Sequence, residues 1–130
     1  MRILKLVCLA AVAALGGCAG PRYSKDAYLQ GKTDAHHALA AGHLVVETYG
    51  LPPTHFEEYT RLMRERYAIE IRPIAGCCVT DTILGHSRGF NVVMEAEVEK
   101  RFGRNVCRQT VVEAERLHRA RVLEAIANEK

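Results

Sequence analysis

The 130-residue sequence predicts a small α/β domain that is rich in helix. Two short segments with many β-branched and apolar residues, 43–49 and 69–79, are typical of strands. The stretch between them, 54–67, carries apolar residues at helical spacing. A strand–helix–strand unit makes its two strands parallel through a crossover. We therefore expect a βαβ-like unit within the order helix, strand, helix, strand, helix, helix.

The first half of the chain supplies three of these elements. A helix is predicted at 25–41, where apolar residues fall on one weak face, and Gly42 favours its end. The strand at 43–49 follows directly. Thr54 and Glu57 then have the spacing of a capping box, in which each side chain accepts a hydrogen bond from the other residue's backbone N–H. This pattern predicts the start of the second helix.

The second strand has the pattern of an exposed edge. Ile69 and Ile71 alternate with charged residues, which indicates one wet face, and Pro73 cannot donate a hydrogen bond to a neighbouring strand. Two strands alone are marginal in water, so helices must cover them or a second copy must extend the sheet. Exposed edges also invite pairing by another chain. The sequence therefore predicts self-association or a protein partner.

The last two helices are predicted at 82–102, capped by Asp81, and at roughly 105–128. Within the first of them lie two glycines, Gly85 and Gly89, each of which costs about 1 kcal/mol relative to alanine in a helix interior. Their spacing of four residues indicates close packing against another backbone, which we expect to be a strand. A binding groove at this place is the alternative.

The first eighteen residues have the layout of an export signal. Arg2 and Lys5 precede an apolar run at 6–14. This run is too short for a permanent membrane span, which needs about 20 residues. It closes with Leu-Gly-Gly-Cys at 15–18, which resembles the lipobox of bacterial lipoproteins. The resemblance implies that Cys18 is diacylated on its sulfur, and that cleavage before it frees an amine that takes a further acyl chain.

The resemblance divides the chain into three parts. Residues 1–17 are expected to be the signal peptide, 18–24 the lipidated cysteine with a short tether, and 25–130 a single globular domain. Two or more acyl chains anchor a protein stably in a membrane. Ala19 stands where an aspartate favours inner-membrane retention in the enterobacterial members of the class. The implied place is therefore the cell envelope, at the outer membrane and facing the periplasm.

Charge and composition argue against a nucleic-acid partner. The formal net charge of the whole chain is +3, and loss of Arg2 and Lys5 with the signal would leave +1. Tryptophan is absent and aromatic residues make up 6% of the chain. A nearly neutral domain lacks the basic field that attracts phosphates, and few rings are present to stack on bases.

Three cysteines remain in the predicted domain: Cys77, Cys78 and Cys107. Thiols in an oxidising compartment tend to pair, and an odd number leaves one over. We expect a disulfide between Cys107 and either Cys77 or Cys78, because a bond between the two adjacent cysteines would close a strained ring. The alternatives are that all three are buried free thiols or that one is reactive.

The histidines His36, His37 and His43 form the most suggestive group of candidate metal ligands. Imidazole suits zinc, copper or nickel, and His36 and His43 are two helical turns apart. However, a helix that ends at Gly42 would direct His43 elsewhere. The chain has no His-Glu-x-x-His or Cys-x-x-Cys pattern. Surface histidines are therefore the simpler interpretation.

The leading functional prediction is a membrane-anchored, non-enzymatic envelope lipoprotein that binds a protein partner or itself. Its expected contacts are the sheet edge at 69–73 and the rigid turn at 49–53. The alternative is a small-ligand or metal binder that uses the histidines above together with Cys77 or Cys78. A thiol enzyme, in which His86 activates Cys77 or Cys78, ranks third. We expect no cofactor and assign no catalytic residue.

Overall fold

The computed structural model describes residues 23–129. Along this part of the chain the elements follow the predicted order: α1 (Lys25–Ala40), β1 (Leu44–Tyr49), α2 (Phe56–Tyr67), β2 (Ile69–Ala75), α3 (Asp81–Phe102) and α4 (Val106–Asn128). The two strands are parallel, with Leu44 beside Ile69 and Tyr49 beside Ala75. The structure thus confirms a small, helix-rich α/β domain with a βαβ unit.

The chain joins the domain slightly earlier than the sequence predicts. The export signal at 1–17, Cys18 and most of the tether lie outside the described residues. Tyr23 and Ser24, however, pack on the domain. Ser24 caps α1, and its backbone N–H donates to the carbonyl oxygen of Asp81 at 3.0 Å. The folded part therefore includes the last two residues of the predicted tether.

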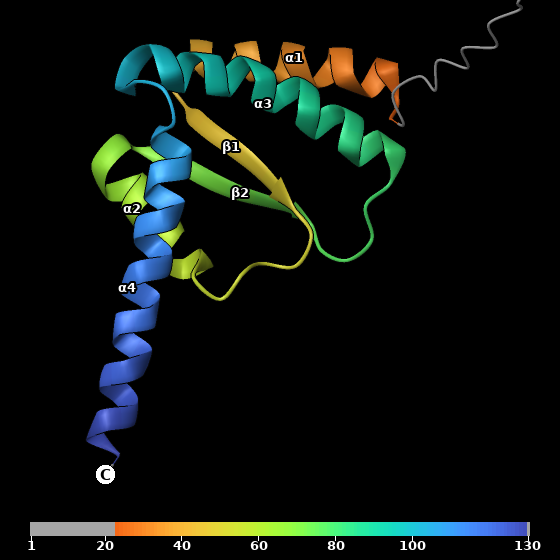
Figure 1. Ribbon diagram of the computed structural model, residues 1–130. Helices are drawn as coiled ribbons and strands as arrows, with labels where there is room; N and C mark the ends of the chain where they lie inside the picture. The colour runs from red at the N-terminus through yellow and green to blue at the C-terminus, as the bar shows by residue number, and fades with distance from the viewer. Residues whose placement is uncertain (1–22, 130) are drawn as a thin grey trace, which may run out of the picture.

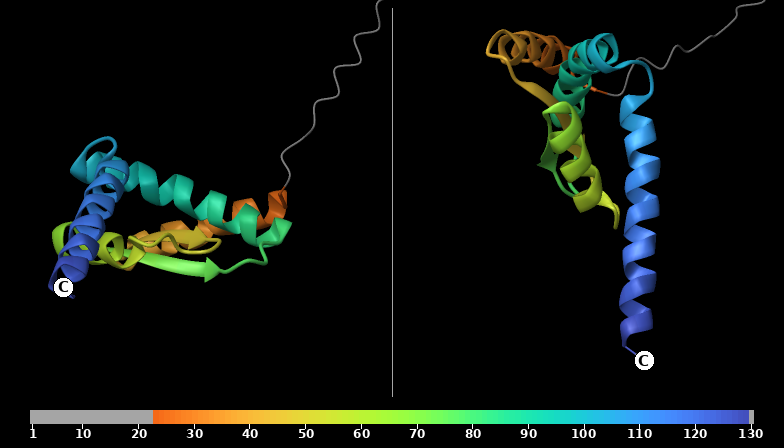
Figure 2. Two further views of the ribbon diagram at one scale, coloured as in Figure 1. Left: turned by 60° about the horizontal axis from the view of Figure 1, so that its bottom comes forward. Right: turned by 90° about the vertical axis from the view of Figure 1, so that its left-hand side faces the viewer.

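The elements form three layers, with the sheet in the middle (Figures 1 and 2). On one side, α1 and α3 pack on β1, and Val45 is buried against Phe90 and Met94. On the other side, α2 and α4 enclose the larger core. This core includes side chains from both strands and both helices: Leu44, Val46, Leu62, Met63, Ile69, Ile71, Val106 and Ala114. Successive strand residues thus pack against opposite layers, because side chains alternate between the two faces of a sheet.

The outer strand β2 has one buried and one open face. Ile69 and Ile71 are buried, whereas Glu70 and Arg72 are exposed and form an ion pair at 3.1 Å. The wet face predicted from the alternation is confirmed. The predicted edge position of Pro73 is also confirmed, because β2 has a single neighbour in the two-stranded sheet.

The starts of two helices differ from the prediction. The capping box of Thr54 and Glu57 is wrong: α2 begins at Phe56 after His55, whose side chain makes no capping hydrogen bond. The N–H of Phe56 instead donates to the carbonyl oxygen of Pro53 at 3.0 Å. The double proline before the helix thus leads into α2 through a backbone turn, without a capping side chain.

The strand β2 is also shorter than predicted and ends at Ala75 rather than at residue 79. The loop that follows is exposed as far as Thr80. Thr80, not Asp81, caps α3, because its hydroxyl oxygen accepts a hydrogen bond from the N–H of Ile83 at 3.2 Å. Asp81 becomes the first residue of the helix, where its negative charge suits the positive end of the helix dipole.

The glycines of α3 allow close packing, but the neighbouring backbone belongs to a helix. A Cβ atom on Gly85 or Gly89 would collide with carbonyl oxygens of Ser24 and Tyr28. On the facing helix, a Cβ atom on Gly31 would collide with the backbone of α3. The expectation of tight packing is therefore confirmed. The expectation of a strand as the partner is wrong, because α1 occupies the place.

Asn91 completes the free edge of β1. Its side-chain oxygen accepts from the N–H of Glu47 at 2.8 Å, and its side-chain nitrogen donates to the carbonyl oxygen of Glu47 at 2.7 Å. These two bonds reproduce the pattern that a third strand would supply. The edge of β1 is therefore occupied by α3, while the outer edge belongs to β2.

The last helix starts in the core and ends outside it. Val106, Thr110 and Ala114 are buried, and Arg66 of α2 forms two hydrogen bonds with Glu113. From residue 119 onward every described side chain is exposed, and the helix extends beyond the other layers (Figures 1 and 2). Within the described residues, no helix is long and apolar enough to cross a membrane.

Candidate functional site

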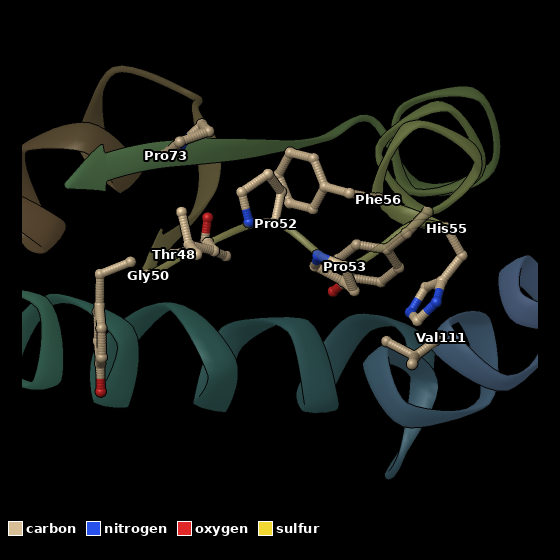
Figure 3. Close-up of a pocket in the computed structure, with 11 residues that line it drawn as sticks. Thr48, Gly50, Pro52, Pro53, His55, Phe56, Pro73 and Val111 are labelled. Atoms are coloured by element: carbon tan, nitrogen blue, oxygen red, sulfur yellow. The ribbon is translucent and has the colours of Figure 1, made fainter. Parts of the chain in front are cut away.

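An apolar groove opens at the carboxyl ends of the two strands (Figure 3). Its volume is about 320 Å³, and its walls come from the turn at 49–53, Phe56 and Tyr59 of α2, Pro73 of β2 and Val111 of α4. In open α/β sheets, ligands bind outside the carboxyl ends of the strands. The two segments predicted as contact sites, the turn and the sheet edge, thus meet in one groove.

Backbone geometry fixes the turn that forms one wall. Gly50 has a φ of +91°, which an L side chain rarely adopts. Its N–H donates to the carbonyl oxygen of Ala75 at 3.0 Å, so the turn is tied to the end of β2. Pro52 and Pro53 then restrict φ over two successive residues. The wall is therefore preorganised, and it holds Leu51 at its tip with 81% of its surface exposed.

The helical walls add rings and no formal charge. Figure 3 shows Phe56 beside Pro52 and the ring of His55 directed toward Val111. Tyr59 is buried, and its burial raises the pKa of the hydroxyl well above the ordinary value, so the side chain stays neutral. No Asp, Glu, Lys or Arg lines the groove. Such a lining suits an apolar or neutral side chain rather than an ion.

A second site of interest is His86, which lies between two carboxylates. Its Nδ1 is 3.2 Å from a carboxylate oxygen of Glu47, and its Nε2 is 3.0 Å from one of Asp34. Burial opposes the charged imidazole, but the hydrogen bond with Asp34 and the charge of Glu47 outweigh it, so the pKa of His86 is raised. The hydrogen bond from His86 in turn lowers the pKa of Asp34.

This arrangement connects the layer of α1 and α3 to the sheet. Asp34 belongs to α1, Glu47 to β1 and His86 to α3. Glu47 is buried and follows three apolar residues of β1, and a buried carboxylate requires a partner. A glutamate directly after the apolar residues of β1 was the feature of the sequence that indicated a buried charged site. Its partner could not be identified, because Glu47 and His86 are 39 residues apart.

A second polar cluster joins α2 to α4. The carboxylate of Glu58 is 7% exposed, and Arg121 donates to it at 2.6 Å. Nδ1 of His118 lies 3.6 Å from the other oxygen of Glu58. These two atoms have no hydrogen-bond partner within the described structure. The helical pattern placed Glu58 on the solvated face, and the protruding α4 is the element that covers it.

The structure does not bring Cys107 together with the other two cysteines. All three are free thiols; Cys77 and Cys78 are exposed, and Cys107 is half-buried. Cys77 and Cys78 precede α3 and Cys107 follows it, and this 22-residue helix spans about 33 Å. Disulfides need Cα atoms within about 7 Å. The structure therefore gives no support to the predicted bridge from Cys107.

His86 is also not available to the cysteines. Both of its ring nitrogens are within hydrogen-bonding distance of carboxylates. It therefore has no free nitrogen to accept a proton from Cys77 or Cys78. The geometry gives no support to a thiolate–imidazole pair.

All three histidines predicted as metal ligands are exposed. His36 and His37 lie in α1, and His43 follows the end of that helix. Among residues 23–129, no group of three or more His, Cys, Asp or Glu side chains is placed to hold a metal ion. The metal site at His36, His37 and His43 stays a prediction.

Comparison with known proteins adds no family assignment. No family model matches the chain, and no curated protein or solved structure matches it.

Proposed function

We propose that the protein is a lipid-anchored envelope protein whose single domain is a non-enzymatic binding module. The anchor is Cys18 at the end of the lipobox-like segment, and the expected place is the outer membrane, facing the periplasm. The observation that supports binding is the apolar groove at the turn 49–53. The groove is preorganised, uncharged and open, which are properties of a site for another molecule rather than of a core.

The edge of β2 continues from the groove and offers backbone hydrogen bonds. Pro73 belongs both to this strand and to the groove wall. Within the described residues, the segment 69–73 makes no backbone–backbone hydrogen bond outside the sheet. Edge strands with free N–H and C=O groups are templates for an added strand. The edge of β2 can thus bind the backbone of an added strand, while the groove beside it can bind one of that strand's side chains.

The occupant that fits this surface is an extended segment of a partner protein. An added strand would bond to the edge of β2 and place an apolar side chain in the groove. Binding by strand addition takes affinity from the backbone and specificity from such pockets. A charged ligand is disfavoured, because no charged side chain lines the groove.

Photo-cross-linking in intact cells tests this proposal. A photoreactive amino acid at position 51 or 72 should give the same adduct, since Leu51 marks the groove and Arg72 the strand edge. Leu29 provides the matched control, because it is 62% exposed on α1, in the opposite layer. An adduct from positions 51 and 72 but not from 29 supports the proposal. The same adduct from position 29, or no adduct from any position, would contradict it.

The protruding end of α4 favours self-association as a second candidate. Apolar side chains are exposed there in consecutive turns: Val122, Leu123 and Ile126. Basic residues predominate just before this stripe (Arg116, Arg119 and Arg121, with Glu115 among them), whereas Glu124 lies within it and Glu129 follows it. An antiparallel pair of these helices would set basic residues beside acidic ones and cover the apolar stripe. The favoured occupant is therefore a second copy.

Sedimentation of the purified protein in detergent tests self-association. We expect a dimer whose dissociation constant rises at least tenfold in Leu123→Glu and Ile126→Glu, because each change places a carboxylate in the apolar stripe. Leu29→Glu, on α1, is the control and should leave the dimer intact. A monomeric wild-type protein, or a dimer that survives both α4 changes, would refute this candidate.

A further inference from the structure

Cys77 and Cys78 form an exposed pair of adjacent thiols. Their Sγ atoms are 3.7 Å apart, and both residues lie in the loop between β2 and α3. The loop is exposed from Gly76 to Thr80, and a Cβ atom added at Gly76 would meet nothing within 4 Å. Solvent reagents can therefore reach both sulfurs.

We propose that Cys77 and Cys78 are a reversible dithiol–disulfide site that reacts with an external disulfide. The thiolate of one cysteine attacks a sulfur of the external disulfide, forms a mixed disulfide and releases one thiol. The thiolate of the other cysteine then attacks the protein sulfur of that mixed disulfide, closes the Cys77–Cys78 bond and releases the second thiol. Two electrons pass from the dithiol to the external disulfide, and the two protons leave on the released thiols.

Two geometric facts favour this pair over a bond to Cys107. The sulfurs need to approach from 3.7 Å to the bonded distance, which is about 2.05 Å, whereas Cys107 lies beyond the far end of α3. Cys107 is also half-buried, and burial together with the charge of Glu95 raises the pKa of its thiol. A smaller thiolate fraction makes it a slower nucleophile.

The resulting bond should be easy to reduce. Consecutive Cα atoms are about 3.8 Å apart, whereas disulfides usually join Cα atoms about 4.4–6.8 Å apart. The ring of adjacent cysteines is therefore strained, and strained, exposed disulfides are the labile ones. This is the property of a site that cycles rather than of a structural staple.

The pair also lacks the further ligands of a metal centre. In the described part of the chain, no third His, Cys, Asp or Glu side chain completes a metal site with them. Thiol–disulfide exchange needs only the two sulfurs and the co-reactant. This inference stands apart from the proposed partner groove, because it depends on neither the groove nor the edge of β2.

Peptide mass spectrometry after equilibration in glutathione buffers tests the proposal. Because trypsin does not cut between Arg72 and Pro73, it places both adjacent cysteines in the peptide 67–88 and Cys107 in the separate peptide 105–108. With the folded, full-length protein, we expect peptide 67–88 to become two hydrogens lighter as the buffer is made more oxidising. Returning the buffer to reducing conditions should reverse this change.

Variants separate the two exchange steps. Cys77→Ser and Cys78→Ser should each stop at a stable adduct of one glutathione on peptide 67–88, because the resolving thiol is gone. Cys107→Ser should behave as the wild type does. The proposal is overturned if wild-type peptide 67–88 stays reduced, keeps glutathione adducts, or becomes linked to peptide 105–108.

Phenylarsine oxide gives an independent test without oxidation. One arsenic atom bridges two neighbouring thiols, so the wild-type protein and Cys107→Ser should each bind one equivalent. Cys77→Ser and Cys78→Ser should each lose this binding. Equal binding by all four proteins would show that the two sulfurs do not act as a pair.

Discussion

Three glycines determine how closely α1 and α3 approach each other. At Gly31, Gly85 and Gly89, an added Cβ atom would overlap backbone atoms of the facing helix or of its N-cap residue. A flexible side chain can move aside, but a helix backbone can do so only if the two helices separate. Separation would loosen the layer that covers Val45 of β1.

Gly89→Ala should therefore destabilise the protein by about 1–3 kcal/mol despite the better helix propensity of alanine. The control is Gly76→Ala, where the added Cβ atom meets nothing within 4 Å. This control should change the free energy of unfolding by less than about 0.5 kcal/mol. Urea denaturation of both variants measures the difference, and equal stabilities would contradict the packing argument.

His86 makes the stability of the layer formed by α1 and α3 depend on pH. Its pKa is raised in the folded protein by Asp34 and Glu47, against the effect of burial. A group whose pKa is higher in the folded than in the unfolded state stabilises the fold when it is protonated. That contribution is complete below the unfolded pKa of about 6.5. It is lost as the pH rises through the folded value.

His86→Gln should therefore lose more stability at about pH 5.5 than at about pH 8.5. The lower value is far enough above the depressed pKa of Asp34 to keep that carboxylate charged. The exposed His43→Gln is the control and should show no such difference. Thermal denaturation of the variants and the wild type at both pH values measures the loss of stability. An equal loss at the two values would mean that the charge of His86 contributes nothing.

At the scale of elements, the sheet is sealed differently on its two edges. The side chain of Asn91 bonds to both backbone groups of Glu47 and so replaces a third strand at β1. The outer edge of β2 is protected by sequence instead, with Pro73 and the ion pair of Glu70 with Arg72. Charged residues and proline are devices that limit uncontrolled strand pairing. A partner segment must therefore be complementary to Pro73 and to the charged pair on this edge in order to add to it.

Asn91→Leu should cost about 1–3 kcal/mol, because the half-buried N–H and C=O groups of Glu47 lose their partner. Gln109→Leu, at an exposed position of α4, should cost less than about 0.5 kcal/mol. Equilibrium unfolding measures both values. If the two changes cost the same, the side chain of Asn91 does not secure the edge of β1.

The elements were predictable because each carries a local pattern. The alternation at Ile69 and Ile71 defines β2 without any knowledge of its neighbours. The helix boundaries were less predictable, since backbone turns compete with side-chain caps. At α2 the turn from Pro53 to Phe56 replaced the capping box, and at α3 the cap moved to Thr80.

The candidate site was predictable only in its parts. The turn at 49–53 and Pro73 could each be chosen from the sequence, but their meeting in one groove depends on the parallel register. The contact of His86 with Glu47 depends on residues far apart in sequence, and no local signal encodes it. The same holds for Glu58, which is covered by α4 rather than by its own helix.

At the scale of the whole molecule, the proposed lipid anchor at Cys18 would set where the groove can act. Only four residues separate Cys18 from Tyr23, the first residue that the structure describes. The domain is therefore expected close to the membrane surface, with the groove available to segments of other envelope proteins.

Metabolic labelling with an alkyne analogue of palmitate tests the anchor. Labelled lipid should be attached to the wild-type protein and absent from Cys18→Ser, which should also leave the membrane fraction. Cys8→Ser, which changes another cysteine of the predicted signal, is the control and should stay labelled. Unchanged labelling of Cys18→Ser would place the lipid elsewhere.

The proposed binding requires that the groove and the neighbouring edge of β2 are the surface that a partner occupies. Amide hydrogen exchange measures this directly, when the protein extracted from membranes with its partners is compared with the same protein purified alone. We predict slower exchange in the segments 48–56 and 69–75 of the extracted protein and no change across α1. Slower exchange confined to α1 and α3, or identical exchange in the two samples, would contradict the account.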